Sequence, residues 1–526
     1  MAYPKCKGVH VGEWLALSAE RNPGAVCFED VGERTTHTFA ETSARVNRLA
    51  SAMQAAGLAK GDRIALLATD SHRYMETLLA SLALGTTYVP LNYRLSSFEL
   101  QTLLAASGAE WLFVTRRYLE PARGLRTHTG EEFKLVCYDG EAEGATAYED
   151  LLASGGDEPF SPRGWAIGEN DMAGLAFTSG TTGRPKGVMQ SYSMLKNLVV
   201  NMSIDYGIGS DEHRYSAAPL SHISGMAIVF MGIARGYGNI LSPQFDAAEV
   251  LGWLQEDRLS GAFLVPTMIS SLLEQPGVEN AEYGRLRNIL YGAAPMPPAL
   301  LRRAMATFGC DFVNAFGAGT EAGLQTVLNA ADHRRALDGH EHLLASIGRP
   351  AFGVAVRICD DDLNDVAPGE VGELVTRSDT VMSGYLGDEE ASALALRDGW
   401  FRAGDLAWRD EEGYYYLAGR KKDMIIRGGE NIYPLEIENV LAEHSALLEV
   451  AVVGVPDAHW GERVRAFLVM RSGAARPSDE ELVALCRTKL AGFKVPAEFL
   501  WVESLPRNAS GKVLKRELRE AEAEGS

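Results

Sequence analysis

Apolar residues along the first third of the chain recur in two alternating patterns. Stretches with apolar residues three and four positions apart predict amphipathic helices. Short apolar runs between these stretches are typical of buried strands. Helices that alternate with strands form largely parallel sheets covered by helices, so this region predicts an α/β fold. The predicted helices are 39–56, 74–84 and 98–106, and the predicted strands are 63–68, 88–91 and 111–114.

The pattern changes in the last third of the chain. From about residue 347 to residue 416, short β runs are separated by turns such as Pro368-Gly369. Beyond Asp423, a strand over 424–427, a Gly-Gly turn and a helix that opens at Pro434 predict a small α+β domain. A chain of 526 residues also exceeds one hydrophobic core. The sequence therefore predicts a large domain with a β subdomain, followed by a small domain.

Composition narrows the class of protein. Hydrophobic residues make up 46% of the chain and charged residues 23%, which are ordinary globular values. A net charge of -20 argues against a nucleic-acid binder, and we expect no nucleic-acid partner. The six scattered cysteines indicate buried thiols in a reducing compartment. Because 1–10 has no apolar signal-peptide core and 226–234 is too short to span a bilayer, we expect a cytoplasmic protein without integral membrane contact.

The stretch from Thr178 to Gly187, TSGTTGRPKG, combines hydroxyl groups, glycines and one lysine between an apolar run and a stretch with helical spacing, 189–202. Glycines let the backbone approach a polyanion, and hydroxyl and free N–H groups donate hydrogen bonds. Lysine adds a mobile positive charge. We predict a phosphate-binding loop between a strand and a helix, although it lacks the Gly-x4-Gly-Lys-Ser/Thr spacing of nucleotide kinases. Its candidate residues are Thr178, Ser179, Gly180, Thr181, Thr182, Gly183 and Lys186.

This loop resembles the signature loop of the adenylate-forming superfamily, which contains acyl-CoA synthetases, luciferases and peptide-synthetase adenylation domains. A serine- and glycine-rich surface turn is the alternative interpretation of one isolated match. Four further stretches in the order expected of the superfamily argue against that alternative. The resemblance spans the whole chain and implies ATP and Mg²⁺ as cofactors.

The stretch from Asn314 to Glu321 resembles the pattern aromatic-Gly-x-Thr-Glu of the superfamily. The resemblance implies that Thr320 contacts the α-phosphate and that Glu321 holds magnesium. Phe316 lies one residue farther from Glu321 than the pattern requires, so either Phe316 or Gly317 occupies the adenine-stacking position. The segment that lies along adenine in the family corresponds to Gly292, Ala293 and Ala294.

Three matches concern the ribose and the connection between domains. Asp405, in the sequence GWFRAGD, corresponds to the carboxylate that accepts hydrogen bonds from both ribose hydroxyls, and Arg420 to a second ribose contact. Lys422 corresponds to the hinge about which the last domain rotates. The resemblance thus implies a large domain over 1–419, a hinge over 420–422 and a small domain over 423–526.

Four residues of the small domain match positions that act on coenzyme A or ATP. Gly428 and Gly429 match the turn that closes over the pantetheine arm of CoA, and Trp460 matches a position near CoA. Lys512, in the sequence NASGKV, corresponds to the adenylation lysine.

His222 has two interpretations. It is either a helix-capping or core histidine or, by the resemblance, a residue beside the carboxylate of the acid, with helix 223–234 lining the acyl pocket. Members that activate amino acids place an aspartate here, because an unpaired buried ammonium is costly. Residues 221–234 contain no acidic residue, so we expect a fatty or aryl acid and not an α-amino acid.

These matches predict a carboxylic acid–CoA ligase of fatty or aryl acid metabolism. It would bind a small carboxylic acid, ATP and CoA, form an acyl-adenylate, and then release acyl-CoA, AMP and pyrophosphate. The alternatives are an acyl-AMP ligase that loads a carrier protein, a luciferase-like oxygenase and a nonenzymatic nucleotide-binding regulator. Whether the protein is a monomer or a homodimer stays open. The catalytic candidates are Lys512, Thr320, Glu321, His222 and Lys186.

Overall fold

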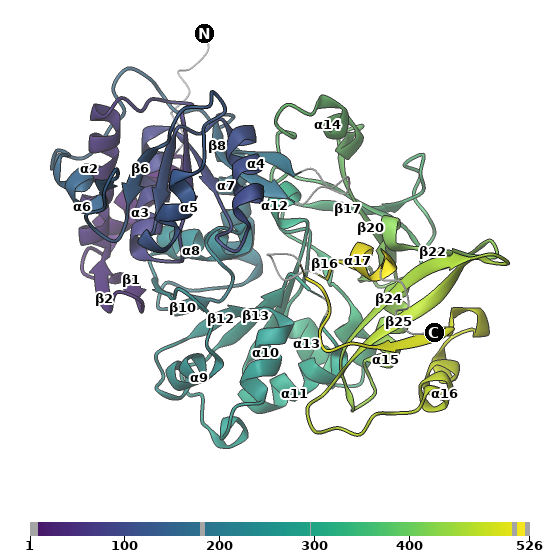
Figure 1. Ribbon diagram of the computed structural model, residues 1–526. Helices are drawn as coiled ribbons and strands as arrows, with labels where there is room; N and C mark the ends of the chain where they lie inside the picture. The colour runs from purple at the N-terminus through teal and green to yellow at the C-terminus, as the bar shows by residue number, and fades with distance from the viewer. Residues whose placement is uncertain (1–8, 179–184, 295, 508–512, 521–526) are drawn as a thin grey trace, which may run out of the picture.

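The structure is a computed structural model that describes residues 9–178, 185–294, 296–507 and 513–520. In Figure 1 the chain passes from helix-covered sheets, drawn in purple and teal, through a green β region to a yellow-green sheet near the C-terminus. This arrangement confirms the predicted α/β fold with a β subdomain and a small C-terminal domain. Within the described residues, no helix is both long and apolar enough to cross a membrane.

One large sheet has the strand order β16-β15-β14-β13-β12-β10-β11-β1-β2. Its strands from β14 to β1 are parallel, while β15, β16 and β2 join antiparallel at the two ends. The bounds are β1 (Val26–Asp30), β2 (Thr35–Thr38), β10 (His213–Ser216), β11 (Gly238–Leu241), β12 (Gly261–Leu264), β13 (Asn288–Gly292), β14 (Asp311–Phe316), β15 (Thr326–Leu328) and β16 (Arg349–Pro350).

A second sheet has the order β7-β6-β5-β3-β4-β8-β9 and is parallel except for the pair of β8 and β9. Its bounds are β3 (Arg63–Leu67), β4 (Thr87–Pro90), β5 (Trp111–Val114), β6 (Lys134–Cys137), β7 (Thr146–Ala147), β8 (Met172–Thr178) and β9 (Lys186–Ser191).

Alternation along the strands places one apolar core between the two sheets and one on each outer face. On β3, Ile64 and Leu66 belong to the central core, whereas Ala65 and Leu67 face the outer core of the second sheet. On β12, Phe263 points to the central core and Ala262 to the outer core of the first sheet. Since side chains alternate across a strand, fully apolar strands are those covered on both faces.

The helices begin and end at local sequence signals. Thr38 and Glu41 form a capping box at the start of α2, and Gly85 ends α3 in the left-handed conformation. The helices of the large domain are α1 (Trp14–Arg21), α2 (Phe39–Ala55), α3 (His72–Leu84), α4 (Ser97–Ser107), α5 (Arg116–Arg123), α6 (Tyr148–Ala153), α7 (Tyr192–Asp205), α8 (Ile223–Arg235), α9 (Ala247–Gln255), α10 (Pro266–Leu273), α11 (Pro298–Phe308), α12 (Gly319–Ala322), α13 (Ala330–Leu337) and α14 (Glu389–Ala395).

The prediction that the phosphate loop joins a strand to a helix is wrong. The segment after Thr178 leads into β9, which pairs antiparallel with β8 so that Thr178 lies opposite Lys186. Helix α7 starts only at Tyr192, where the Ser191 side chain accepts a hydrogen bond from the Met194 N–H. Periodicity alone did not separate the short strand from the helix that follows it directly, because a few apolar residues fit both patterns.

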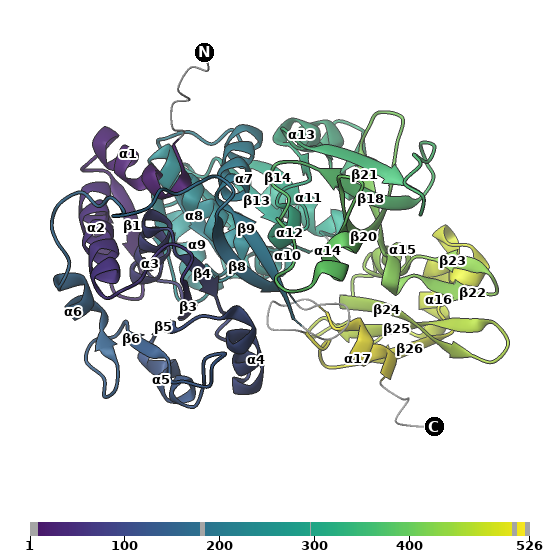
Figure 2. The same cartoon turned by 90° about the horizontal axis from the view of Figure 1, so that it is seen from above.

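A β subdomain and the small domain complete the chain. The subdomain sheet pairs β17, β18, β20 and β19, with β21 beside β20. In the small domain, β22 and β23 form a hairpin around Gly428 and Gly429, whose φ angles of +60° and +89° suit a two-residue turn. Helix α15 of the small domain packs near β21 of the β subdomain, so the two domains are in contact there (Figure 2). The bounds are β17 (Ala355–Cys359), β18 (Gly372–Arg377), β19 (Leu396–Arg397), β20 (Trp400–Arg409), β21 (Tyr415–Arg420), β22 (Ile425–Arg427), β23 (Glu430–Ile432), β24 (Leu447–Asp457), β25 (Gly461–Met470), β26 (Glu498–Trp501), α15 (Pro434–Leu441), α16 (Asp479–Lys489) and α17 (Lys515–Glu520).

Candidate active site

The predicted site residues of the large domain gather at the ends of strands. Thr178 ends β8, Gly292 ends β13 and Phe316 ends β14. The carboxyl ends of parallel strands form the crevice in which α/β proteins bind ligands. The fold therefore brings together loops that are separated by more than a hundred residues in the sequence.

Thr178 and Glu321 contact each other directly. The Thr178 hydroxyl donates a hydrogen bond to Glu321 Oε1 over 3.1 Å. Glu321 lies on the short helix α12, whose backbone is held on two sides: Gln190 Nε2 donates to the Thr320 carbonyl over 3.2 Å, and the Met382 N–H donates to the Glu321 carbonyl over 2.7 Å. Two predicted motifs thus meet, and a hydroxyl and a carboxylate face one another there. Oxygen donors of this kind suit Mg²⁺, which prefers carboxylate ligands.

Tyr385 lies beside the candidate site, and the sequence alone did not point to it. Lys186 Nζ lies 4.8 Å from the centre of its ring, and Tyr385 pairs with Val188 of β9 across an isolated bridge. Burial is the main cause that raises the pKa of the Tyr385 hydroxyl to about 12; the charge of Glu321 acts in the same direction and that of Arg420 in the opposite one. Tyr385 therefore lies within electrostatic reach of both the Glu321 carboxylate and the Arg420 guanidinium. No motif or periodicity around residue 385 distinguishes this tyrosine from an ordinary half-buried one.

Asp405 and Arg420, the two predicted ribose contacts, are paired. They are register partners on β20 and β21, and Arg420 Nη1 lies 3.0 Å from Asp405 Oδ1. Arg420 Nη2 also donates to the Ala403 carbonyl over 2.9 Å. Arg420 Nε is buried and has no hydrogen-bond partner among the described residues. An acceptor on a ligand would satisfy that donor, which fits a binding role for this pair.

His222 caps helix α8. Its Nδ1 lies 2.7 Å from Ser224 Oγ and accepts a hydrogen bond from the Ser224 N–H over 3.2 Å. When Nδ1 accepts, the neutral ring carries its proton on Nε2, and that tautomer can donate to a carboxylate. The next residue, Ile223, lies so close to α12 that a Cβ added to Gly319 would be 3.0 Å from Ile223 Cγ2. His222 is therefore a helix cap close to α12, and its role toward the acid stays a prediction.

The small-residue segment after β13 is closely packed on one side and open on the other. A Cβ added to Gly292 would lie 2.2 Å from the Ala315 carbonyl oxygen, so a larger residue would not fit there. Ala293 and Ala294 are exposed, and Ala293 adopts φ +64°, which is strained for a residue with a side chain. Strained backbone of this kind is found at binding sites.

Phe316 and Gly317 remain alternatives for the adenine contact. Phe316 is half-buried and packs against the apolar cluster that contains Ile223 and Met226. A Cβ added to Gly317 would lie 2.0 Å from the Gly323 carbonyl oxygen, so the chain itself fills the space that a side chain would take at Gly317. The backbone at Gly317 is nevertheless exposed.

The predicted CoA-side residues also come together. The Gly428 N–H donates to the Trp460 carbonyl over 2.8 Å, and the Trp460 ring lies within 2.8 Å of where a Gly428 Cβ would be. Lys422 lies in a short 3₁₀ turn, Lys421–Asp423, between β21 and β22. Five residues predicted for the phosphate loop and the predicted adenylation lysine lie outside the described residues; they are Ser179, Gly180, Thr181, Thr182, Gly183 and Lys512.

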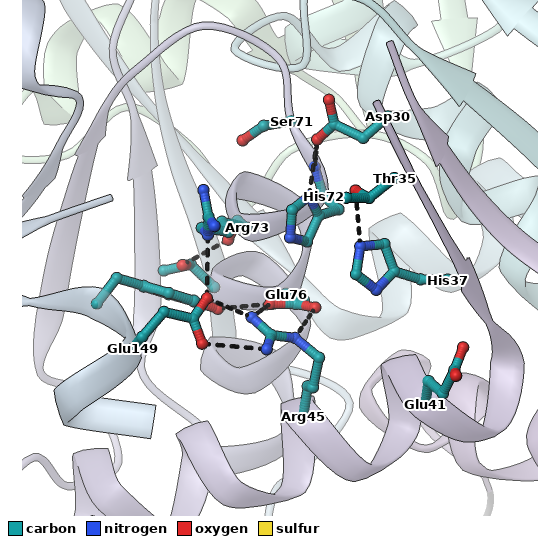
Figure 3. A network of polar contacts seen from close by, with 12 residues as sticks. Asp30, Thr35, His37, Glu41, Arg45, Ser71, His72, Arg73, Glu76 and Glu149 are labelled. Atoms are coloured by element: carbon teal, nitrogen blue, oxygen red, sulfur yellow. Dashed lines mark hydrogen bonds and ion pairs between the residues drawn. The ribbon is translucent and has the colours of Figure 1, made fainter. Parts of the chain in front are cut away.

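Among the described residues, one other cluster has the spacing of metal ligands, but its chemistry does not fit a metal. The ligand atoms of His37, His72 and Glu76 lie within 4.8 Å of one another (Figure 3). Arg45 already binds both Glu76 oxygens, at 2.7 and 3.0 Å, so a second cation would be repelled. The two imidazoles also stack at 4.2 Å with 24° between their planes, so their lone pairs lie in nearly parallel planes, which disfavours a single ion in the plane of both rings. This cluster is a structural network.

Comparisons with known proteins agree with the motifs. Residues 15–386 match the AMP-binding enzyme family, and residues 436–512 match the AMP-binding enzyme C-terminal domain. A feruloyl-CoA synthase from Amycolatopsis sp is 38% identical over 510 residues, covering 97% of this chain and 98% of that protein. An indoleacetate–CoA ligase from Aromatoleum aromaticum is 35% identical over 514 residues, with 97% and 98% covered. The structure of o-succinylbenzoate CoA synthetase from Bacillus subtilis with its acyl-adenylate intermediate superposes with a TM-score of 0.83 at 30% identity, covering 97% of this chain and 98% of that one.

Proposed function

The chain belongs to the AMP-binding enzyme family and is an AMP-forming acid–thiol ligase, and on this premise we propose which residues perform its two half-reactions and which acids it takes. In the first half-reaction the carboxylate oxygen of the acid attacks the α-phosphorus of ATP and pyrophosphate leaves. In the second, the CoA thiol gives up its proton to solvent, its sulfur attacks the acyl carbonyl, and AMP leaves with the electron pair of the broken bond between the acyl carbon and the phosphate oxygen. Neither step needs a protein nucleophile, so the protein supplies alignment and charge stabilisation.

In the first half-reaction, Thr178 and Glu321 hold the phosphate end of ATP. Magnesium, when bound, would neutralise phosphate charge, and Glu321 with the neighbouring Thr178 hydroxyl is the oxygen donor set that fits it. Thr320 binds the α-phosphate, and Lys186 and Lys512 bring positive charge to the phosphates. The Nε2–H of His222 orients the carboxylate of the acid at the start of α8.

The nucleoside end of ATP lies across the carboxyl ends of β13, β14 and β20. Asp405 accepts hydrogen bonds from the ribose hydroxyls, since a carboxylate is an acceptor only. Arg420 holds Asp405 in place and offers its buried Nε to the ligand. Gly292, Ala293 and Ala294 leave a flat surface for the adenine, and Phe316 or Gly317 covers its other face.

In the second half-reaction, the domain after Lys422 turns and brings the Gly428-Gly429 turn and Trp460 to the adenylate. The positive φ of Gly428 and Gly429 keeps side chains out of this turn, which leaves a path for the pantetheine arm. This mechanism divides the chain into a large domain up to residue 419, a hinge over 420–422 and a mobile domain from 423.

An aryl or arylalkyl carboxylic acid is the substrate class that we propose. The names of two relatives that share 35–38% identity with this chain refer to feruloyl and indoleacetate groups, both aromatic acids. Helix α8 is buried and apolar from Gly225 to Ile233, which suits a ring as well as an alkyl chain. A fatty acid is the second candidate on the same ground.

The observation that carries the proposal is the hydrogen bond between Thr178 and Glu321, because it joins the phosphate loop to the magnesium-binding motif at one strand end. The test measures ATP–pyrophosphate exchange and acyl-CoA formation with ferulate, indoleacetate, benzoate and a series of fatty acids. We expect exchange and CoA-dependent AMP release with an aromatic acid. A chain that binds ATP but exchanges no pyrophosphate with any acid would instead be a nucleotide-binding regulator.

Measuring the two half-reactions separately distinguishes the role of Lys512 from that of the Gly428-Gly429 turn. Lys512→Ala should reduce pyrophosphate exchange about 10²- to 10³-fold, as expected for loss of a transition-state contact, yet spare thioester formation from a supplied acyl-adenylate. Exchange that survives with transfer to a carrier protein, but not to free CoA, would assign the chain as a carrier-loading ligase.

A further inference from the structure

The residue before Lys422 is anchored to the β subdomain. Lys421 Nζ forms an ion pair with Asp361 and lies 3.5 Å from Glu373 Oε2. The Glu373 side chain is almost fully buried and also binds Arg402. The side chain of Lys421 is therefore tied to the β subdomain, through the turn after β17 and through β18.

The residue after Lys422 is anchored to the small domain. Asp423 Oδ1 accepts a hydrogen bond from Arg519 Nη2 over 2.7 Å, and the same nitrogen lies 3.5 Å from the Lys422 carbonyl oxygen. Arg519 lies on α17, at the far end of the small-domain sequence. Both partners are partly buried, with 31% and 14% of their side chains exposed, so solvent screens this pair less than a surface pair.

Helix α17 is in turn fixed to the body of the small domain. Lys515 Nζ lies 2.6 Å from Glu438 Oε1, and Glu438 also accepts the Val452 N–H over 2.7 Å. Val513, the residue after Lys512, pairs with Arg507 across an isolated bridge. In the sequence, Arg519 lies seven positions after Lys512.

We propose that Arg519 is a positioning residue of this ligase: by binding Asp423 it ties α17 to the residue next to the pivot, so that a turn at Lys422 carries α17 with it. The proposal rests on the proposed function, because Lys512 must act in the first half-reaction. With Lys421 and Asp423 each held by its own domain, Lys422 is the residue left to absorb the change of dihedral angles. A displacement of about 1 Å in a positioned group can cost about 10²-fold in rate, so a lost tether at Arg519 has a measurable effect.

The test compares Arg519→Gln with Arg516→Gln in both half-reactions. Arg516 lies on the same helix, but its side chain is 75% exposed and its pair with Glu520 spans 3.8 Å. We expect Arg519→Gln to lower pyrophosphate exchange about 10- to 100-fold while thioester formation from a supplied acyl-adenylate stays within threefold. The KM for ATP should change less than twofold, because the proposed contacts to adenine, ribose and magnesium all precede Lys422 in the chain. Arg516→Gln should match the parent in every measurement.

Rescue distinguishes positioning from stability. Arg519→Lys, and the exchange Arg519→Asp with Asp423→Arg, should restore most of the lost exchange rate, since both keep an ion pair. Equal losses in the two half-reactions, an unchanged exchange rate in Arg519→Gln, or no rescue by either variant would overturn the proposal. If the parent shows no pyrophosphate exchange, or Lys512→Ala leaves it intact, the proposed function fails instead, and the two failures are distinct.

Discussion

The network around Glu76 and the site around Glu321 both collect charged residues from distant parts of the chain, but they use charge differently. Glu76 is fully buried, Arg45 binds both of its oxygens, and the Tyr148 hydroxyl donates to it over 2.8 Å. At the site, Arg420 keeps a buried donor without a partner in the described chain, and Lys186 lies over an aromatic ring.

The difference separates structure from binding. Charges that satisfy one another inside a protein hold its elements in place, and they have little capacity left for a ligand. Donors that remain unsatisfied at strand ends cost stability and are retained where a ligand completes them. The buried network joins β1, β2, α2, α3 and α6, whereas the site lies where the two sheets and the β subdomain meet (Figures 1 and 3).

The largest expected effect is on stability. Arg45→Met leaves the Glu76 carboxylate buried without its cation and should lower the free energy of unfolding by about 3–5 kcal/mol, measured by urea denaturation. Pyrophosphate exchange per folded molecule should be unchanged. The double variant Arg45→Met with Glu76→Leu should recover most of the loss, because it removes the stranded charge. A loss below about 1 kcal/mol in the single variant would show that the network contributes little.

At the site, the effect should fall on activity. Glu321→Gln should leave the unfolding free energy within about 1 kcal/mol of the parent, because Gln keeps a hydrogen-bond acceptor for the Thr178 hydroxyl. It should raise the magnesium concentration needed for half-maximal exchange and slow exchange about 10²-fold, since an amide is a poorer ligand for a hard cation. A magnesium titration of pyrophosphate exchange measures both. An unchanged magnesium dependence would place the ion elsewhere.

A smaller effect resolves the adenine contact. If Phe316 stacks on the base, Phe316→Ala should weaken ATP binding by about 1–3 kcal/mol, as nucleobase stacking does. Titration calorimetry with ATP measures the affinity. An affinity within twofold of the parent would place Gly317 at the ring and assign Phe316 to the apolar cluster of Ile223 and Met226.

The smallest expected effect is on thermal stability and concerns Asp70. It follows β3 and accepts the Leu220 N–H over 2.9 Å; burial raises its pKa to about 7. The unfolded carboxyl loses its proton near pH 4, so the folded state holds one proton more between about pH 4 and 7, and its stability falls as pH rises through that window. Asp70→Asn removes this pH dependence of the stability. We expect the Tm of the variant relative to that of the parent to rise by about 2 °C between pH 5 and pH 8. Equal Tm differences at both pH values would contradict the raised pKa.

Local signals determined much of the fold from the sequence alone. Capping residues such as Thr38 and Glu41, and the glycine at 85, act within one turn of the chain. The ends of the helices that they start or stop were therefore predicted to within two or three residues. The Gly428-Gly429 turn was readable for the same reason, because a two-residue hairpin demands residues that tolerate positive φ. The ordered motifs indicated the family, which the family models confirm.

Tertiary structure decided which of these motifs share one site. Thr178 and Glu321 are separated by 143 positions, and only the packing of two sheets brings the ends of β8 and β14 together. Asp405 and Arg420 pair because β20 and β21 align in register, and Tyr385 enters the site through a bridge to Val188 that no local pattern announces. The hairpin of β8 and β9 escaped prediction for the same reason. Periodicity reports which face of an element is buried, but it does not report which other element covers that face, and the partner is set by the cooperative packing of the whole core.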